Sequence, residues 1–214
     1  SIAKGTKTRS VAFVKAHGCL MIAAWILLAG TAITLARYYK DMWPGKNVPV
    51  YEKPIWFSLH SLCNILAVLC TIIAFILIFY FKQEWSDLDG ESPNILRSHP
   101  YLGVIVTACA IINPVMAIFR PSPTGKRRPI FNWAHWLVGT IALIAGILTV
   151  FSGLNLTLSK SFTSSWMTRL LLAFVVFAII IDILLEVLRC KVNRDKAKNE
   201  MEMTAPGEPA EKGG

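Results

Sequence analysis

The chain has 214 residues, of which 54% are hydrophobic and only 16% are charged, with 22 Lys and Arg against 13 Asp and Glu and a formal charge of +9. A soluble domain carries about 25% charged residues, so this composition lacks the polar cover that a soluble surface needs. The positive charge lies between apolar blocks, which indicates membrane topology and argues against nucleic acid as a partner.

Five apolar blocks follow one another along the chain, and each is long enough, or nearly so, to cross about 30 Å of hydrocarbon as a helix. They run approximately over residues 11–36, 56–81, 100–119, 131–152 and 166–188. We therefore predict an all-α transmembrane helical bundle over residues 11–190, embedded in a lipid bilayer and preceded by a juxtamembrane segment at 1–10. Residues 191–214 are charged and end in TAPGEPAEKGG, so we expect a disordered tail.

Five crossings put the two termini on opposite sides of the membrane. The C-terminal side carries fourteen Lys and Arg and the N-terminal side eight. Since cytoplasmic loops are enriched in these residues, the C-terminus is predicted to be cytoplasmic and the N-terminus non-cytoplasmic. The N-glycosylation pattern at Asn155 falls on the predicted non-cytoplasmic side and agrees. We expect a multi-pass glycoprotein of the plasma membrane or an endomembrane.

Each of the first four blocks carries one histidine at a common offset from the beginning of the block. The histidines are His17, His60, His99 and His135, and the residues six positions before them are Val11, Pro54, Pro93 and Pro129. Proline is favoured in the first turn of a helix, so every histidine is expected near the N-terminal end of its helix. Because successive helices run in opposite directions, the histidines form two layers, one on each side of the membrane.

An ionisable side chain inside a membrane span is costly and indicates function. The ordinary alternative is a histidine hydrogen-bonded between helices, which four histidines paired at two depths make less attractive. Two facing imidazoles can supply both axial ligands of a haem iron, and such a haem carries electrons rather than binding oxygen. Zinc would be under-coordinated by two histidines in each layer. The residues thus predict two redox centres about 15–20 Å apart, and hence transmembrane electron transfer.

Four local strings resemble the cytochrome b561 domains that are fused to a DOMON domain. They are AHGCLMIAAW at 16–25, WFSLHS at 56–61, HPYLG at 99–103 and NWAHWLVG at 132–139. The first resembles the HG-x-LM-x-x-AW opening of the family, and the others its remaining histidine helices. The resemblance runs from about residue 15 to 188 and registers all four histidines.

The resemblance implies a four-helix core with two b-type haems, one held by His17 and His99 on the non-cytoplasmic side and one by His60 and His135 on the cytoplasmic side. It implies that cytosolic ascorbate reduces the inner haem and that the outer haem reduces monodehydroascorbate or a ferric chelate, as a ferric reductase does. The family has six helices where this chain shows five spans. A DOMON domain would precede Ser1, and a homodimer is a further expectation.

Several other residues are candidates for the cofactor and substrate sites. Glycine lets a flat ring approach a helix, although helix packing explains glycine equally well. Haem propionates need cations, and ascorbate, an anion, needs a basic cytoplasmic site, although cytoplasmic cations are also what the charge rule predicts. The cofactor candidates are Gly18, Gly103, Gly139, Arg37 and Arg97, and the ascorbate candidates are Lys53, Lys126, Arg127 and Arg128.

Two other functions remain open from the residues. One is a membrane scaffold or receptor-accessory protein that keeps the fold without the redox role, although such a relative should have lost a histidine. The other is a membrane cytochrome b that oxidises a quinol.

Overall fold

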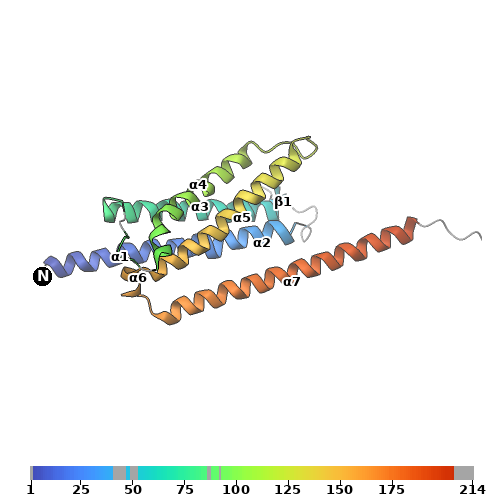
Figure 1. Cartoon of the computed structure of the whole chain (residues 1–214). Coiled ribbons are helices and arrows are strands. Elements are labelled where there is room, and N and C mark those ends of the chain that lie inside the picture. The colour runs from blue at the N-terminus through green and yellow to red at the C-terminus, as the bar shows by residue number, and fades with distance from the viewer. Residues whose placement is uncertain (1, 41–46, 49–52, 86–87, 92, 205–214) are drawn as a thin grey trace, which may run out of the picture. The chain divides into compact units, whose positions relative to one another are not determined.

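The computed structural model describes residues 2–40, 47–48, 53–85, 88–91 and 93–204 (Figure 1). Within them, five helices are long and apolar enough to cross a membrane, which confirms the predicted transmembrane bundle. These spans are Val11–Tyr38, Ile55–Lys82, Asn94–Ile118, Arg128–Asn155 and Ser165–Thr204. The chain divides into two compact units, Ser1–Leu172 and Ala173–Gly214, which are described separately.

The first span is a helix with a change of pitch in its middle. Helix α1 (Ile2–Ile22) leads into a π-helix, η1 (Ala23–Leu28), and then into α2 (Ala29–Tyr38). A π-helical turn inside an α-helix accommodates one extra residue and shifts the register of everything beyond it. Because α1 begins at Ile2, the segment expected to precede the span is the first part of this helix.

The second span is introduced by a short hairpin. Strands β1 (Asn47–Val48) and β2 (Lys53–Pro54) pair antiparallel, and Pro54 then caps α3 (Ile55–Lys82). Proline suits this position because a helix leaves its first N–H groups unpaired. Gln83 ends α3 in a left-handed conformation, with its N–H donating to the carbonyl of Phe79 at 2.8 Å.

The third and fourth spans are again antiparallel. A 3-10 turn, η2 (Asn94–Ser98), precedes α4 (His99–Ile118), which contains Pro114, and a tight loop leads to α5 (Arg128–Asn155). The short α6 (Thr157–Lys160) follows, and the Glu91 carboxylate accepts hydrogen bonds from the main-chain N–H and hydroxyl of Thr157 at 2.9–3.1 Å. This contact ties the end of α5 to the approach to α4.

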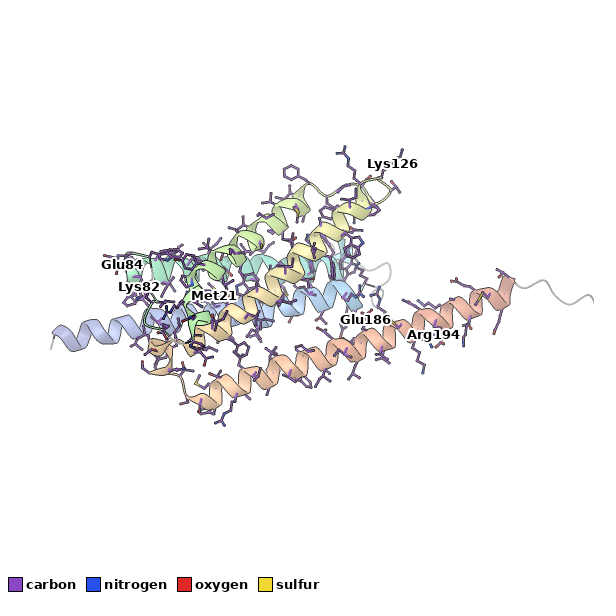
Figure 2. The ribbon with its side chains drawn as sticks, in the orientation of Figure 1. Met21, Lys82, Glu84, Lys126, Glu186 and Arg194 are labelled. Carbon is purple, nitrogen blue, oxygen red and sulfur yellow. The ribbon has the colours of Figure 1, made fainter. Side chains whose placement is uncertain are left out.

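Unit 1 is built from two intimate helix pairs, α1–η1–α2 with α3 and α4 with α5, and the pairs meet chiefly through α5 against α1 and η1. Small residues dominate its interior, as in membrane bundles where helices approach closely. They include Ala24, Ala32, Ala74, Ala142 and Gly146. The outward faces of α3, α4 and α5 carry exposed Leu, Ile, Val and Phe, as a lipid-facing surface requires. Lys82 and Glu84 lie at one end of the unit and Lys126 at the other (Figure 2).

Helix α7 (Ser165–Thr204) runs from the end of unit 1 through most of unit 2. Its apolar stretch gives way to a charged one that includes Glu186 and Arg194 (Figure 2), and Glu186 pairs with Arg189 at 3.9 Å. A disordered tail was expected from Lys191, but the helix continues to Thr204. Lys, Glu, Ala and Met are good helix formers, and extending an existing helix avoids the cost of nucleation. Residues 205–214 lie outside the described part.

Candidate metal centres

The four histidines come together in two pairs, one toward each end of unit 1. The imidazoles of His17 on α1 and His99 at the start of α4 have centroids 6.4 Å apart and planes inclined at 75°. Those of His60 on α3 and His135 on α5 are 6.3 Å apart and inclined at 65°. The structure therefore brings together the same pairs that the alternating helix directions predict.

Three of the imidazoles are oriented by a main-chain carbonyl of a neighbouring helix. Nδ1 of His17 lies 2.9 Å from the carbonyl oxygen of Ala74, and Nδ1 of His60 lies 2.8 Å from that of Ala32. A carbonyl oxygen can only accept, so each Nδ1 carries the hydrogen and each Nε2 keeps its lone pair as an acceptor. This is the arrangement by which proteins orient a metal-binding histidine. At His60 the amide nitrogen of Asn64 lies 3.4 Å from this Nε2.

His99 follows the same pattern. Its Nδ1 lies 3.0 Å from the carbonyl oxygen of Thr149 and 3.1 Å from the hydroxyl of Ser152, which itself donates to that carbonyl. His135 is the exception, because its buried Nδ1 makes no hydrogen bond of standard geometry, and neither does the buried Oδ1 of Asn113.

The spacing within each pair fits a metal ion held between two imidazoles. With a metal–nitrogen bond of about 2.0 Å, and about 1.1 Å from that nitrogen to the centre of its ring, the two centroids would be about 6 Å apart. The observed separations are 6.4 and 6.3 Å. Among the described residues no group of three His, Cys, Asp or Glu side chains converges, so each donor set consists of two imidazoles.

The two pairs are far apart along the bundle. Helix α3 carries both His60 and Ala74, the residue to which His17 is hydrogen-bonded, and Ala74 stands at position i+14 from His60. At about 1.5 Å of rise for each position, the two layers are about 21 Å apart, close to the separation expected from the sequence. The distance is about two thirds of the hydrocarbon thickness of a bilayer.

Two cations, Arg120 and Lys40, lie near the His60/His135 pair. The charge of Arg120 bears on both imidazoles and that of Lys40 bears on His60. Arg120 lies over the ring of Phe57 at 5.2 Å and Lys40 over the ring of Trp56 at 5.3 Å. Partial burial, together with the nearby charge of Arg128, lowers the pKa of the Arg120 guanidinium, which nevertheless stays protonated in a protein.

The model of the eukaryotic cytochrome b561 family matches residues 16–161, a stretch that contains all four histidines. The chain belongs to the eukaryotic cytochrome b561 family. The resemblance predicted from the four histidine strings is thereby confirmed.

The relatives of this cytochrome b561 chain include named reductases. Ferric-chelate reductase 1 of Homo sapiens is 32% identical over 187 residues, which are 87% of this chain and 30% of that protein. Ferric-chelate reductase 1 of Mus musculus is 33% identical over the same shares. A cytochrome b561 and DOMON domain-containing protein of Arabidopsis thaliana is 22% identical over 78% of this chain and 33% of its own length.

The chain spans about 30% of the length of the reductases that it matches. No solved structure matches it.

A cytochrome b561 is a haem protein, so membership of the family implies that the chain binds haem b. The two imidazole pairs are the donor sets in unit 1 that fit this group. Phe131 stacks on His135 with centroids 5.6 Å apart and planes at 16°, and the amide nitrogen of Asn64 donates to the carbonyl of His60 at 2.8 Å. Phe131 thus packs against one histidine of this pair, and Asn64 is hydrogen-bonded to the main chain of the other.

The predicted cofactor glycines differ in their surroundings. A Cβ at Gly18 would meet nothing within 4 Å, and one at Gly103 would make an ordinary contact of 3.6 Å with Phe75. At Gly139 a Cβ would lie 2.9 Å from the amide nitrogen of Asn113. Their role beside a macrocycle stays a prediction.

Two glycines outside the predicted set lie in closer contacts. A Cβ at Gly153 would lie 2.7 Å from Cε1 of His99, and one at Gly146 would overlap the indole of Trp25. With Gly139 they recur at every seventh position along α5 and so fall on one face of that helix. This regular spacing was the signal that could have identified them.

The predicted cations are distributed over both ends. Arg97 lies in η2, just before His99, and its Nε donates to the carbonyl of Glu91 at 3.1 Å. Arg37 lies in the last turn of α2, toward the opposite layer. Their role with haem propionates stays a prediction.

The predicted ascorbate residues gather around the start of α5, with one exception. Arg128 donates to the carbonyl of Pro121 at 2.6 Å and lies 5.7 Å from the centroid of Phe131, while Lys126 and Arg127 are exposed. Lys53 belongs to β2, and its side chain lies outside the described part.

The glycosylation candidate ends α5. The amide of Asn155 donates to the carbonyl of Phe151 at 2.9 Å, and Thr157 of the same pattern is bound to Glu91. Its glycosylation stays a prediction.

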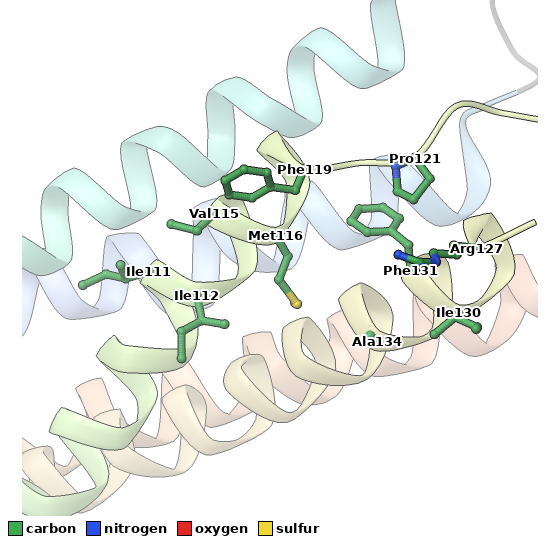
Figure 3. Close-up of a pocket in the computed structure, with 10 residues that line it drawn as sticks. All are labelled: Ile111, Ile112, Val115, Met116, Phe119, Pro121, Arg127, Ile130, Phe131 and Ala134. Carbon is green, nitrogen blue, oxygen red and sulfur yellow. The ribbon is translucent and has the colours of Figure 1, made fainter. Parts of the chain in front are cut away.

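A cavity of about 450 Å³ lies between α4 and α5 (Figure 3). Its lining is apolar apart from Arg127, and it includes Met116 and Phe131. Since Phe131 also stacks on His135, the cavity reaches the neighbourhood of the His60/His135 pair.

Proposed function

We propose that this chain moves single electrons across a membrane through two b-type haems, from ascorbate on the cytoplasmic side to a ferric chelate on the other side. His60 and His135 hold the haem that accepts the electron, and His17 and His99 hold the one that releases it. The observation that carries the proposal is the presence of two imidazole pairs at two levels of one membrane bundle. Their ring centroids are 6.3 and 6.4 Å apart, the separation that a metal ion bound between two imidazoles would give.

When bound, each haem supplies a one-electron couple. In each pair the two histidines would hold the group from both sides, so it would carry electrons rather than bind oxygen. The carbonyls of Ala32, Ala74 and Thr149 hold three imidazoles through Nδ1, which would leave Nε2 to bind the metal and would limit rearrangement when the charge of the centre changes.

The distribution of charges supports the proposed orientation. The His60/His135 end carries Arg120 and Arg128, with Lys126 and Arg127 in the adjoining loop and start of α5, and cytoplasmic ends are enriched in such cations. The same charges attract an anionic donor and raise its local concentration. Ascorbate gives up one electron and one proton there and becomes monodehydroascorbate. At the other end one ferric ion becomes ferrous, so the electrons balance.

The names of the relatives support the acceptor, because ferric-chelate reductase 1 of two mammals matches most of this chain. Monodehydroascorbate, which differs from a ferric chelate in being an organic radical, is the other acceptor that the family resemblance implies.

Vesicles test the proposal. The purified chain is reconstituted into liposomes that contain ascorbate, and a ferric chelate with a ferrous indicator is added outside. We expect ferrous iron to form outside only when ascorbate is inside, and His60→Leu to abolish it. Haem that ascorbate reduces, without any ferrous iron outside, would contradict transmembrane transfer.

One observation favours a second donor. The cavity beside Phe131 is apolar and has a single charged residue, Arg127, in its lining, which suits a quinol that arrives from the lipid. Reduction of the purified protein by a short-chain quinol in preference to ascorbate would favour this donor. The effect of salt separates them further, since only the anionic donor should react more slowly as ionic strength rises.

A further inference from the structure

The hydrogen bonds that orient the histidines obey a register rule. Within the pair α4 and α5, His99 donates to the carbonyl of Thr149, which stands at position i+14 from His135 on the same helix. Within the other pair, His17 donates to the carbonyl of Ala74, which stands at position i+14 from His60. In both cases the acceptor sits on the partner helix, the same number of turns beyond that helix's own histidine.

Antiparallel packing makes this rule reciprocal. Two antiparallel helices in contact keep the same register along their length, so the i+14 position counted from the first histidine should face the second. In the first pair His60 indeed donates to Ala32, which stands at i+15 from His17, one position further than the rule requires. The π-helix Ala23–Leu28 lies between those two residues and absorbs the extra one.

The same rule puts Asn113 opposite His135. Asn113 stands at position i+14 from His99, and no π-helix intervenes in α4. The contact of its amide nitrogen with Gly139, 2.9 Å from where a Cβ would lie, shows that the side chain rests on α5 one turn beyond His135. The register thus places the main-chain carbonyl of Asn113 opposite His135, as it places main-chain carbonyls opposite the other three histidines.

Asn113 and His135 each hold one buried polar atom without a hydrogen bond of standard geometry, and the two atoms are complementary. Nδ1 of His135 can donate, and Oδ1 of Asn113 can only accept. Buried polar groups are nearly always paired, so a donor and an acceptor that both lack a partner on facing helices are candidates to bond each other. The main-chain carbonyl of Asn113 also lies near His135, but it makes no hydrogen bond of standard geometry with Nδ1, so it is the competing acceptor.

We propose that Asn113 is the positioning residue of His135, with its side-chain Oδ1 accepting the Nδ1–H hydrogen bond that main-chain carbonyls accept from the other three histidines. The inference rests on the proposed haem ligation by His135. A carbonyl of the main chain is present whatever the residue, whereas a side-chain acceptor can be changed by substitution. The cytoplasmic centre therefore has an orienting group whose strength the sequence sets, and its reduction potential is tuned separately from that of the outer centre.

Two substitutions at Asn113 shift the potential in opposite directions. Asn113→Asp supplies a stronger, charged acceptor, which makes His135 a more basic ligand, stabilises the ferric form and lowers the midpoint potential. Asn113→Leu removes the acceptor and raises it. We expect each shift to approach a tenfold change in the one-electron equilibrium, about 59 mV. General damage to the fold would move both variants the same way.

The experiment is a potentiometric titration of the purified full chain, followed by absorbance and by electron paramagnetic resonance, for both variants and for Thr107→Val. Thr107 is the matched control, because it is a polar residue of α4 whose hydroxyl bonds only within its own helix, to Gly103 at 2.8 Å. Opposite shifts of one haem, with the other haem and the control unchanged, support the proposal.

Two haems with unchanged potentials in both Asn113 variants would overturn it and assign the role to the main-chain carbonyl, while the proposed electron transfer would stand. A wild-type chain that binds no haem would overturn both.

Discussion

Alanine at position 153 should dislodge one haem and spare the other. The added Cβ would lie 2.7 Å from Cε1 and 3.2 Å from Nδ1 of His99, whereas ordinary contacts begin at 3.4 Å. The imidazole must therefore retreat by about 0.7 Å, which is more than the ±0.2 Å or so that a metal–ligand distance tolerates. The alternative, separation of α4 from α5, would cost about 1–3 kcal/mol, as overpacking of an interior does.

The assay is the haem-to-protein ratio of purified Gly153→Ala, with the low-spin signals resolved by electron paramagnetic resonance. We expect one haem per chain, with the signal of the His60/His135 centre retained. Gly30→Ala is the control, because a Cβ there meets nothing within 4 Å and should leave both haems in place. Full occupancy and unaltered signals in Gly153→Ala would refute the contact between Gly153 and the metal-binding face of His99.

Three further variants test other parts of the account. His60→Leu should also leave one haem per chain, but the outer one, and ascorbate should no longer reduce it quickly in stopped-flow absorbance. Gly146→Ala should collide with the indole of Trp25 and cost about 1–3 kcal/mol, which lowers the thermal midpoint by about 2–4 °C per kcal/mol. Arg120→Gln should raise several-fold the ascorbate concentration that gives half-maximal reduction, and Arg169→Gln should not. Because Arg120 keeps its charge at neutral pH even though burial lowers its pKa, the Arg120 effect should be constant between pH 6 and 8, which the same assay measures.

The spans and the histidine pairs were predictable because they depend on long-range regularities of the chain. A block of twenty apolar residues has one stable environment, and alternating helix directions sort residues at a common offset into two layers. The pairing of His17 with His99 follows from this alone, and the structure brings the two rings to 6.4 Å.

The fine geometry of the site was not predictable, because it depends on how neighbouring helices are registered. Nothing near Ala74 or Thr149 in the sequence indicates that their carbonyls face a histidine, since a carbonyl belongs to every residue. The π-helix at Ala23–Leu28 shifts the register of the first helix pair by one residue, and nothing in the composition of this segment predicts it. Asn113 was noticeable only as the neighbour of Pro114.

The C-terminal segment shows a different limit. Its charge indicated disorder, but the residues after Cys190 follow a long helix directly, and their own helix propensity is sufficient to continue it to Thr204. Composition measures whether a segment can bury a core, and it does not measure whether a helix that already exists will extend.

The central claim is that two imidazole pairs hold two haems, and the number and ligation of haems in the purified full chain test it most directly. Quantitation of haem together with electron paramagnetic resonance of the oxidised protein should give two haems per chain, both low-spin and six-coordinate. A preparation that binds one haem or none when fully supplied with the cofactor, or a high-spin centre with an open coordination position, would contradict the account.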